Sequence, residues 1–217
     1  MSIRVIIADD HPVAREGIKA VIERKEKDIE VIGEASNGNG ALKMAKNNPA
    51  DIYILDISMP ILNGIETTHR LIKMDPKSKI IILSIHDNRT FVEKVLKCGA
   101  KGYVLKENAT EELIQAIRQV YSNGFFLSPK ISKFIVQGFL GKRHNYAEYK
   151  KAVHLTLKER EILQLIAEGF TNKEIARQLK LSLNTAHVHR NNIMRKLDIH
   201  RQADLIRYAL KEGISQL

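Results

Sequence analysis

Acidic side chains follow two short apolar runs of the sequence and could together bind a metal ion. Asp9 and Asp10 come directly after residues 3–8, and Asp56 comes directly after residues 52–55. If these runs are strands of one parallel sheet, the three carboxylates meet at its carboxyl edge, where ligands gather in such folds. Carboxylates at one place repel one another, and Mg²⁺, which takes oxygen ligands, would neutralise them. The spacing therefore predicts a magnesium site.

Asp56 is the best placed of these residues to act as a nucleophile. It ends the most apolar of the runs, and the turn signals at residues 59–60 (Met-Pro) and 63–64 (Asn-Gly) would shape a loop over the site. A carboxylate can attack phosphorus and form an acyl phosphate while a metal ion and a lysine neutralise the phosphoryl oxygens. Ser84 and Lys106 follow two later runs and would bind those oxygens. We therefore predict that Asp56 is a phosphoacceptor.

The first part of the chain alternates short apolar runs with longer stretches of helical period, which indicates repeated strand–helix units. Such units build an α/β domain around a parallel sheet. The third and fourth runs are almost wholly apolar, as expected for strands that helices cover on both faces. The predicted strands are residues 3–8, 30–35, 52–55, 80–83 and 102–105, and the predicted helices begin near Pro12, Asn39, Gly64, Arg89 and Thr110.

The last part of the chain is predicted to be all α. Thr156 with Glu159, and Thr171 with Glu174, are capping boxes, and Ser182 is a candidate N-cap. These signals predict two short helices, a turn and a longer third helix, which is the order of a helix-turn-helix motif. A final helix should run from about residue 201 to 212.

Between these two parts we predict a short helix at residues 131–140 and a polar, basic linker at residues 141–153. The chain is therefore divided into an α/β domain at residues 1–127, a short helix and linker at residues 128–151, and an all-α four-helix domain at residues 152–217.

The third of the C-terminal helices, residues 184–197, has an apolar and a polar side. At 100° per residue, Ala186, Ile193 and Leu197 fall on one side. The other side could meet base edges in the major groove and phosphates at its flanks. An exposed helix face is polar in most proteins, so this pattern alone leaves DNA binding open. The predicted reading side carries Asn184, His187, Val188, Asn191, Asn192 and Arg195, with Arg190 and Lys196 at its flanks.

The positive charge of the chain lies mainly in its C-terminal part. Residues 131–217 hold 16 Lys and Arg against 8 Asp and Glu, whereas residues 1–130 hold 19 against 17. This excess suits duplex DNA better than a membrane, because no long apolar or amphipathic basic segment accompanies it. A basic surface that only aids solubility is the alternative.

Cysteine usage and the N-terminus predict a cytoplasmic protein. Cys98 is the single cysteine, so no internal disulfide can form and a reducing compartment is expected. The first apolar run is interrupted by two aspartates, unlike a signal peptide, and no run reaches membrane-spanning length.

Residues 1–127 resemble the receiver domain of two-component response regulators, a flavodoxin-like (βα)5 fold with strand order 2-1-3-4-5. The resemblance implies that a sensor histidine kinase or a small acyl phosphate phosphorylates Asp56, with slow self-dephosphorylation and no dedicated enzyme activity. It also implies that Ser84 and Tyr103 turn inward on phosphorylation. The matching residues are Asp9, Asp10, Asp56, Ser84, Lys106 and Tyr103, the last in the aromatic switch position. The implied Mg²⁺ ligands are Asp9, Asp10, Asp56 and the backbone carbonyl of Ser58.

Residues 152–214 resemble the LuxR-type helix-turn-helix of the NarL/FixJ family. The match includes Asn172-Lys173-Glu174-Ile175-Ala176 and Lys196-Leu197. It implies that His187, Val188 and Asn191 read promoter DNA and that the final helix joins two copies into a homodimer, either when phosphorylated or on DNA. Valine is common in the family where this chain has Ala186, and lysine is common where it has His187. The base preference of relatives therefore does not transfer to this chain.

Two other functions compete with a phosphorylation-controlled DNA-binding regulator. Phosphohydrolases of the haloacid dehalogenase type also use a strand-end aspartate with Mg²⁺, but they need a second aspartate two residues later, where this chain has Ser58. A receiver that only holds two copies together would bind DNA without phosphorylation, and the intact acidic set argues against it.

Overall fold

The computed structural model describes residues 2–87, 89–140 and 155–215. The chain divides into two compact units, residues 1–143 and residues 144–217, and each is described by itself. The predicted linker at residues 141–153 lies outside the described residues. The domain boundaries drawn from the sequence stay a prediction.

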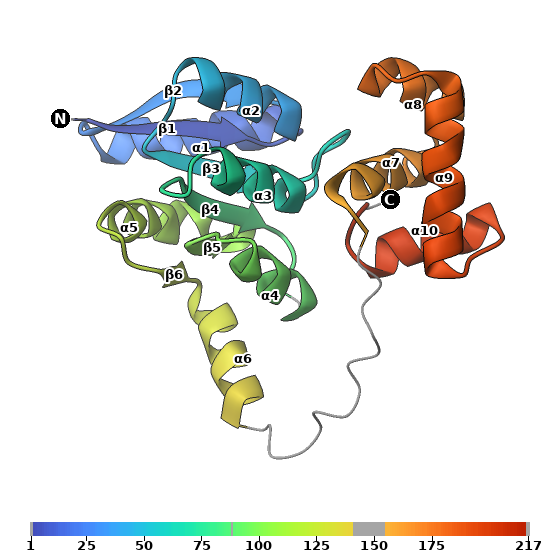
Figure 1. Cartoon of the computed structure of the whole chain (residues 1–217). Coiled ribbons are helices and arrows are strands. Elements are labelled where there is room, and N and C mark those ends of the chain that lie inside the picture. Colours follow the sequence, from blue (N-terminus) through green and yellow to red (C-terminus); the bar gives the residue numbers. More distant parts are fainter. Residues whose placement is uncertain (1, 88, 141–154, 216–217) are drawn as a thin grey trace. The chain divides into compact units, whose positions relative to one another are not determined.

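A six-stranded parallel sheet forms the centre of the first unit (Figure 1). Its order is β2-β1-β3-β4-β5-β6, which confirms the predicted order of the first five strands. The sixth strand pairs with β5 and was not predicted. The strands are β1 Ile3–Ala8, β2 Ile29–Ala35, β3 Ile52–Asp56, β4 Lys79–Ser84, β5 Gly102–Leu105 and β6 Phe126–Leu127.

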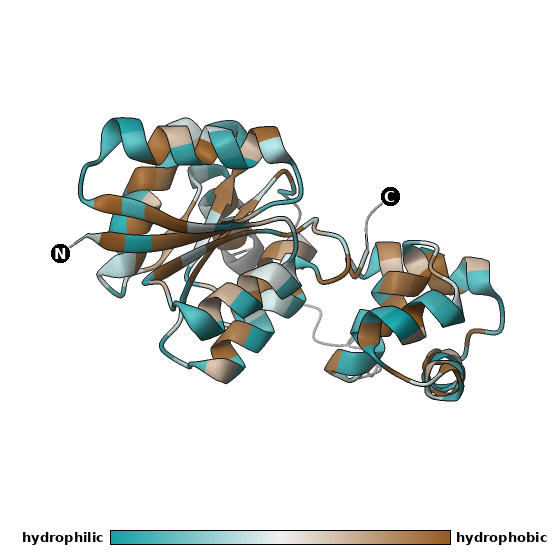
Figure 2. Ribbon diagram, turned by 90° about the horizontal axis from the view of Figure 1, so that it is seen from above, coloured by the Kyte–Doolittle hydropathy of each residue, from teal (hydrophilic) through white to brown (hydrophobic). Residues whose placement is uncertain are grey.

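Helices cover both faces of this sheet, and side chains of β1 show how the faces are divided. Val5 and Ile7 pack with apolar residues of α1 and α5, whereas Ile6 and Ala8 pack with those of α2, α3 and α4. Alternate residues of a strand point to opposite faces, so a strand covered on both sides is apolar at every position. Figure 2 shows the hydrophobic strands between helices whose outer faces are hydrophilic. The helices are α1 Pro12–Lys25, α2 Gly38–Asn47, α3 Gly64–Met74, α4 Arg89–Lys97 and α5 Ala109–Tyr121, and η1 Lys106–Asn108 is a 3-10 turn.

The N-terminal end of the helix α6 (Pro129–Leu140) packs against the rest of the first unit. Ser128, just before it, accepts a hydrogen bond from the backbone amide of Leu105 (3.0 Å). Ile131 is 1% exposed and belongs to the core. Lys130 pairs with Asp87 (3.0 Å) and Glu107 (3.3 Å), in the loops after β4 and β5. The first turn of α6 therefore contacts both loops beside the carboxyl edge of the sheet.

The second unit contains four helices within its described residues: α7 Leu157–Ala167, α8 Asn172–Leu179, α9 Leu183–Leu197 and α10 Gln202–Lys211. Both predicted capping boxes are present. Thr156 accepts from the amide of Glu159 and Thr171 from the amide of Glu174, while each glutamate accepts from the amide of its threonine. Ser182 caps α9 by accepting from the amide of Thr185 (3.0 Å). The capping signals thus set the starts of α7, α8 and α9.

Candidate functional site: an acidic cluster and a basic helix

The acidic residues at the ends of β1 and β3 come together as predicted. Asp9 and Asp56 are 1% and 2% exposed, and Asp10 is partly exposed. Ligand atoms of Asp9, Asp10, His11 and Asp56 lie within 4.8 Å of one another. A cluster of carboxylate oxygens of this kind matches the ligand preference of a hard divalent cation.

Lys106 lies between the two buried carboxylates. Its Nζ is 2.6 Å from Asp9 Oδ2 and 3.0 Å from Asp56 Oδ2. Burial raises the pKa of Asp56, and the nearby charge of Asp9 adds to this increase although Lys106 opposes it. Burial would lower the pKa of Lys106, but the two carboxylates outweigh it and raise that pKa above its ordinary value. The site therefore holds a charged lysine against two carboxylates, one of which is costly to keep ionised.

Two residues that sequence reasoning missed fix the position of Asp9. The backbone amide of His11 donates to Asp9 Oδ1 (2.9 Å), and Arg15 Nη1 donates to the backbone carbonyl of Asp9 (2.7 Å). His11 Nδ1 also lies 2.8 Å from Asp10 Oδ1. The backbone amide of Ser58 bonds to the carboxylate of Asp56. His11 follows the acidic pair directly, and this adjacency was the available signal. The role of the Ser58 carbonyl as a metal ligand stays a prediction.

The loop between β3 and α3 is folded tightly against the end of β3. The amide of Gly64 donates to the carbonyl of Ile57 (3.0 Å), and Asn63 caps α3 by accepting from the amide of Glu66 (2.9 Å). A Cβ atom at Gly64 would lie 2.1 Å from the backbone oxygen of Asp56. Ile61 has φ of 69°, a left-handed conformation that is costly for a β-branched residue. The turn signals at residues 59–60 and 63–64 thus mark a loop shaped by close backbone approach.

Ser84 and Tyr103, the two predicted switch residues, are joined through His86. The amide of His86 donates to Ser84 Oγ (3.0 Å), and the hydroxyl of Tyr103 donates to the carbonyl of His86 (2.6 Å). Both predicted residues are fully buried, and burial raises the pKa of Tyr103 to about 12. The ring of His86 stacks on Phe91 of α4, with 4.8 Å between ring centroids. The loop after β4 therefore connects the end of the acidic site with α4.

The helix α9 presents the predicted reading residues to solvent. Ala186 and Ile193 are 1% and 0% exposed and face the core of the second unit, whereas Leu197 is half-buried. Val188 is 49% exposed. Five other predicted readers are also exposed, whereas Arg190 and Asn192 are half-buried; the exposed residues are Asn184, His187, Asn191, Arg195 and Lys196.

Several of these polar groups already have partners within the unit. Arg190 donates to Asn172 of α8 (3.2 Å) and to Gln202 of α10 (2.7 Å). Lys196 pairs with Glu159 of the first capping box (2.8 Å), and Arg195 donates to Asn192 (3.0 Å). Sequence reasoning did not single out Gln202, or Asn172 beyond its place in a motif, because these contacts depend on how three helices cross.

Comparison with known protein families identifies the family of this chain. The response regulator receiver domain matches residues 5–118, and the luxR family of bacterial regulatory proteins matches residues 153–209. The chain belongs to the two-component response regulators. The regulator combines a receiver domain with a LuxR-type helix-turn-helix that binds DNA and regulates transcription, and its family is not one of dedicated enzymes.

Individual relatives are similar to the regulator over nearly its whole length. The oxygen regulatory protein NreC of Staphylococcus carnosus is 36% identical over 214 residues, covering 97% of this chain and 98% of NreC. The transcriptional regulatory protein DegU of Brevibacillus brevis is 33% identical, covering 97% and 94%. Among solved structures, the Salmonella typhimurium RcsB response regulator has a TM-score of 0.63 at 28% identity, covering 97% and 98%. An RcsB–DNA complex has a TM-score of 0.60 at 27% identity, covering 98% and 99%.

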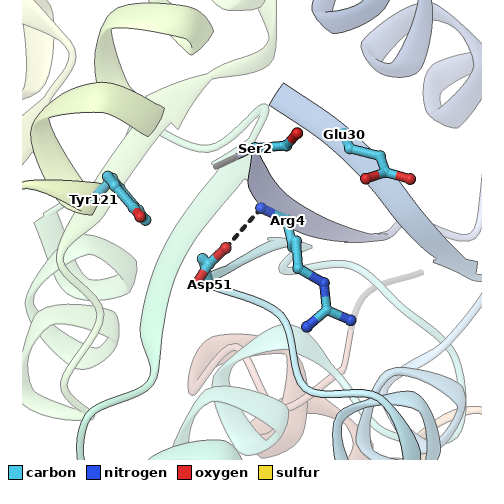
Figure 3. A pocket seen from close by; sticks show the side chains of 5 residues that line it. All are labelled: Ser2, Arg4, Glu30, Asp51 and Tyr121. Carbon is cyan, nitrogen blue, oxygen red and sulfur yellow. Dashed lines mark hydrogen bonds between the residues drawn. The ribbon is translucent and has the colours of Figure 1, made fainter. Parts of the chain in front are cut away.

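The opposite edge of the regulator's sheet carries a pocket of about 350 Å³ (Figure 3). It is lined by Ser2, Arg4, Glu30, Asp51 and Tyr121. The amide of Arg4 donates to Asp51 Oδ2 (2.7 Å), which ties β1 to the turn before β3. Asp51 therefore has a structural role at the amino edge, away from the acidic cluster. Within the described ranges, no helix combines the length and the apolar character needed to cross a bilayer.

Proposed function

We propose that Asp56 accepts a phosphoryl group from a sensor histidine kinase and that this modification controls dimerisation and DNA binding. The observation that carries the proposal is the position of Lys106, whose Nζ contacts buried oxygens of both Asp9 and Asp56. In the transfer, a carboxylate oxygen of Asp56 forms a bond to phosphorus while the bond from phosphorus to the kinase's histidine nitrogen breaks. Lys106 and the hydroxyl of Ser84 would then bind phosphoryl oxygens.

We also propose that Asp9, Asp10, Asp56 and the backbone carbonyl of Ser58 hold Mg²⁺. Oxygen donors from two neighbouring strand ends support this, since His11 is the single non-oxygen ligand in the cluster that the described residues form. When bound, the ion would neutralise charge on the transferred oxygens. The residues of the chain orient the acceptor: Lys106 holds one oxygen of Asp56, and the amide of Ser58 bonds to the same carboxylate.

The proposed output is promoter DNA bound by a homodimer in the cytoplasm. We propose that His187, Val188 and Asn191 read bases, as their exposure on α9 allows. Phosphate contacts and flanking base contacts are assigned to Asn184, Arg190, Arg195 and Lys196. The RcsB–DNA complex, which is similar over nearly the whole chain, supports duplex DNA as the partner.

The test compares the wild type with Asp56→Asn after incubation with Mg²⁺ and acetyl phosphate, or with beryllofluoride. We expect light scattering to show a dimer, and a mobility-shift assay to show tighter DNA binding, in the wild type alone. Equal oligomeric state and equal DNA retention in the two proteins would instead show that the receiver is a passive scaffold.

A further inference from the structure

Asn172, the first residue of α8, contacts two residues of the reading helix. Its Oδ1 accepts a hydrogen bond from Arg190 Nη1 (3.2 Å), and its Nδ2 lies 3.2 Å from His187 Nδ1 and 3.4 Å from His187 Nε2. Asn172 is half-buried, whereas His187 is exposed. One side-chain amide therefore joins an arginine of α9 to an exposed histidine one turn earlier on the same helix.

Arg190 decides which way this amide faces. A guanidinium has donors and no acceptor, so the atom of Asn172 that it contacts must be the oxygen. Gln202 at the start of α10 accepts from the other terminal nitrogen of Arg190 (2.7 Å), which holds the guanidinium from a second side. The Nδ2 group of Asn172 is consequently directed to His187.

The orientation of the amide in turn decides where His187 carries its hydrogen. An amide NH₂ group can only donate, so the ring nitrogen that it bonds must be an acceptor without a hydrogen. A neutral imidazole has one such nitrogen, and its other nitrogen carries the N–H. This result is the same whether Asn172 bonds Nδ1, which is closer, or Nε2. The nitrogen of His187 that does not accept from Asn172 is therefore a hydrogen-bond donor.

We propose that Asn172 is a positioning residue for base recognition, and that it makes His187 a donor to an acceptor on the major-groove edge. A G·C pair is the expected target, because its guanine offers the acceptors N7 and O6 side by side on that edge. The inference rests on the proposed role of α9 in reading DNA. It extends that role to a residue of α8 and assigns a chemical class of base to His187.

The test is selection of DNA from a random library by the full-length regulator treated with Mg²⁺ and beryllofluoride. His187→Ala identifies the base position that His187 reads. We expect the wild type to enrich a G·C pair there, and Asn172→Ala to lower that enrichment about 2- to 10-fold, the range for one hydrogen bond. Other positions should keep their preference. Combining Asn172→Ala with His187→Ala should lower the preference at the His187 position no further than His187→Ala alone, because both changes act on the same contact.

Gln178→Ala, an exposed change on the same helix, is the matched control and should leave every preference unchanged. Thermal melting of each variant separates lost recognition from lost folding. The inference is overturned if Asn172→Ala preserves the preference at the His187 position, if it weakens all positions equally, or if an A·T pair is selected there. Failure of the wild type to select any sequence would count against the proposed function itself.

Discussion

Replacing Gly64 by alanine should damage the phosphoacceptor loop through one added methyl group. Gly64 starts α3, and a Cβ there would lie 2.1 Å from the carbonyl oxygen of Asp56, 2.9 Å from its carbonyl carbon and 3.0 Å from Cα of Ile57. Non-bonded carbon atoms prefer about 3.5–4.0 Å, so both carbon–carbon contacts are about 0.5 Å or more too short, and the contact with the carbonyl oxygen is far shorter still. All three obstructing atoms are backbone, and no side-chain rotation relieves the clash.

The loss of stability depends on which backbone segment moves to relieve the clash. Either α3 shifts away from the sheet, or the backbone of Asp56 moves and its carboxylate leaves Lys106. Overpacking of this kind typically costs 1–3 kcal/mol, and the severity of this clash places the expected loss at roughly 3 kcal/mol or more. For a domain of this size, that loss lowers the unfolding temperature of the receiver by about 10 °C. Labelling of Asp56 by acetyl phosphate should fall in parallel at temperatures where the variant is still folded.

Gly17→Ala is the matched control. Gly17 lies on the exposed side of α1, and a Cβ there meets nothing within 4 Å. Alanine in a helix interior is favoured over glycine by about 0.5–1 kcal/mol, so this variant should melt slightly higher than the wild type. Calorimetry and phosphorylation kinetics check both variants. Because φ of Gly64 is not positive, alanine can adopt the same backbone conformation, and the expected loss comes from the clash alone. A Gly64→Ala protein that melts within 2 °C of the wild type and is phosphorylated at the normal rate would therefore refute the close-approach reasoning.

Three further predictions follow from the charged sites. Burial raises the pKa of Asp56, so the wild type loses stability as pH rises through that pKa and the carboxylate ionises. Asp56→Asn should therefore melt at a higher temperature than the metal-free wild type at pH 7. Calorimetric scans should show that this difference disappears near pH 4. Mg²⁺ should stabilise the wild type, by about 2.7 kcal/mol at 100 times its Kd, but not Asp9→Asn, as thermal shift assays would show. Burial would raise the pKa of Glu159, but Lys196 and the amide of Thr156 outweigh burial and lower that pKa. Glu159→Gln should therefore lower the free energy of unfolding of the second unit by about 1–2 kcal/mol at pH 7. This cost should shrink as pH falls below about 4.5 through the lowered pKa, and an equal cost at pH 7 and pH 3.5 in denaturant titrations would argue against the ion pair.

Local signals made the helix starts of the second unit predictable. A capping box needs a hydroxyl and a carboxylate three residues apart, and both groups act within one turn, so the sequence contains the whole interaction. The carboxyl edge of the sheet was predictable for a similar reason, since Asp9 and Asp56 each come directly after an apolar run of the sequence. The strand order came from the resemblance to receiver domains, because apolar runs do not reveal which strands are neighbours.

Contacts between distant segments were not predictable. The strand β6 has two residues, too few to show any alternation, and it exists because it pairs with β5. The approach of Gly64 to the backbone of Asp56 is set by how α3 packs on β3, and the sequence shows only an Asn-Gly turn. The pairing of Asn172 with His187 requires the crossing of α8 and α9, which helical periodicity does not determine.

The ion pair of Lys196 with Glu159 has a consequence for how DNA affinity responds to salt. Each phosphate neutralised by a protein cation releases counterions and adds about 0.9 to the slope of log affinity against log salt concentration. Lys196 adds fully to this slope only if its ammonium group binds a phosphate in place of Glu159, and that exchange would remove a partner of the carboxylate that caps α7. The contribution of α9 to the slope should therefore be smaller than Arg190, Arg195 and Lys196 would give if each bound a phosphate. The same ion pair links the C-terminal end of α9 to the first residues of α7, so a weaker ionic contribution of Lys196 to DNA affinity would accompany a more firmly held helix.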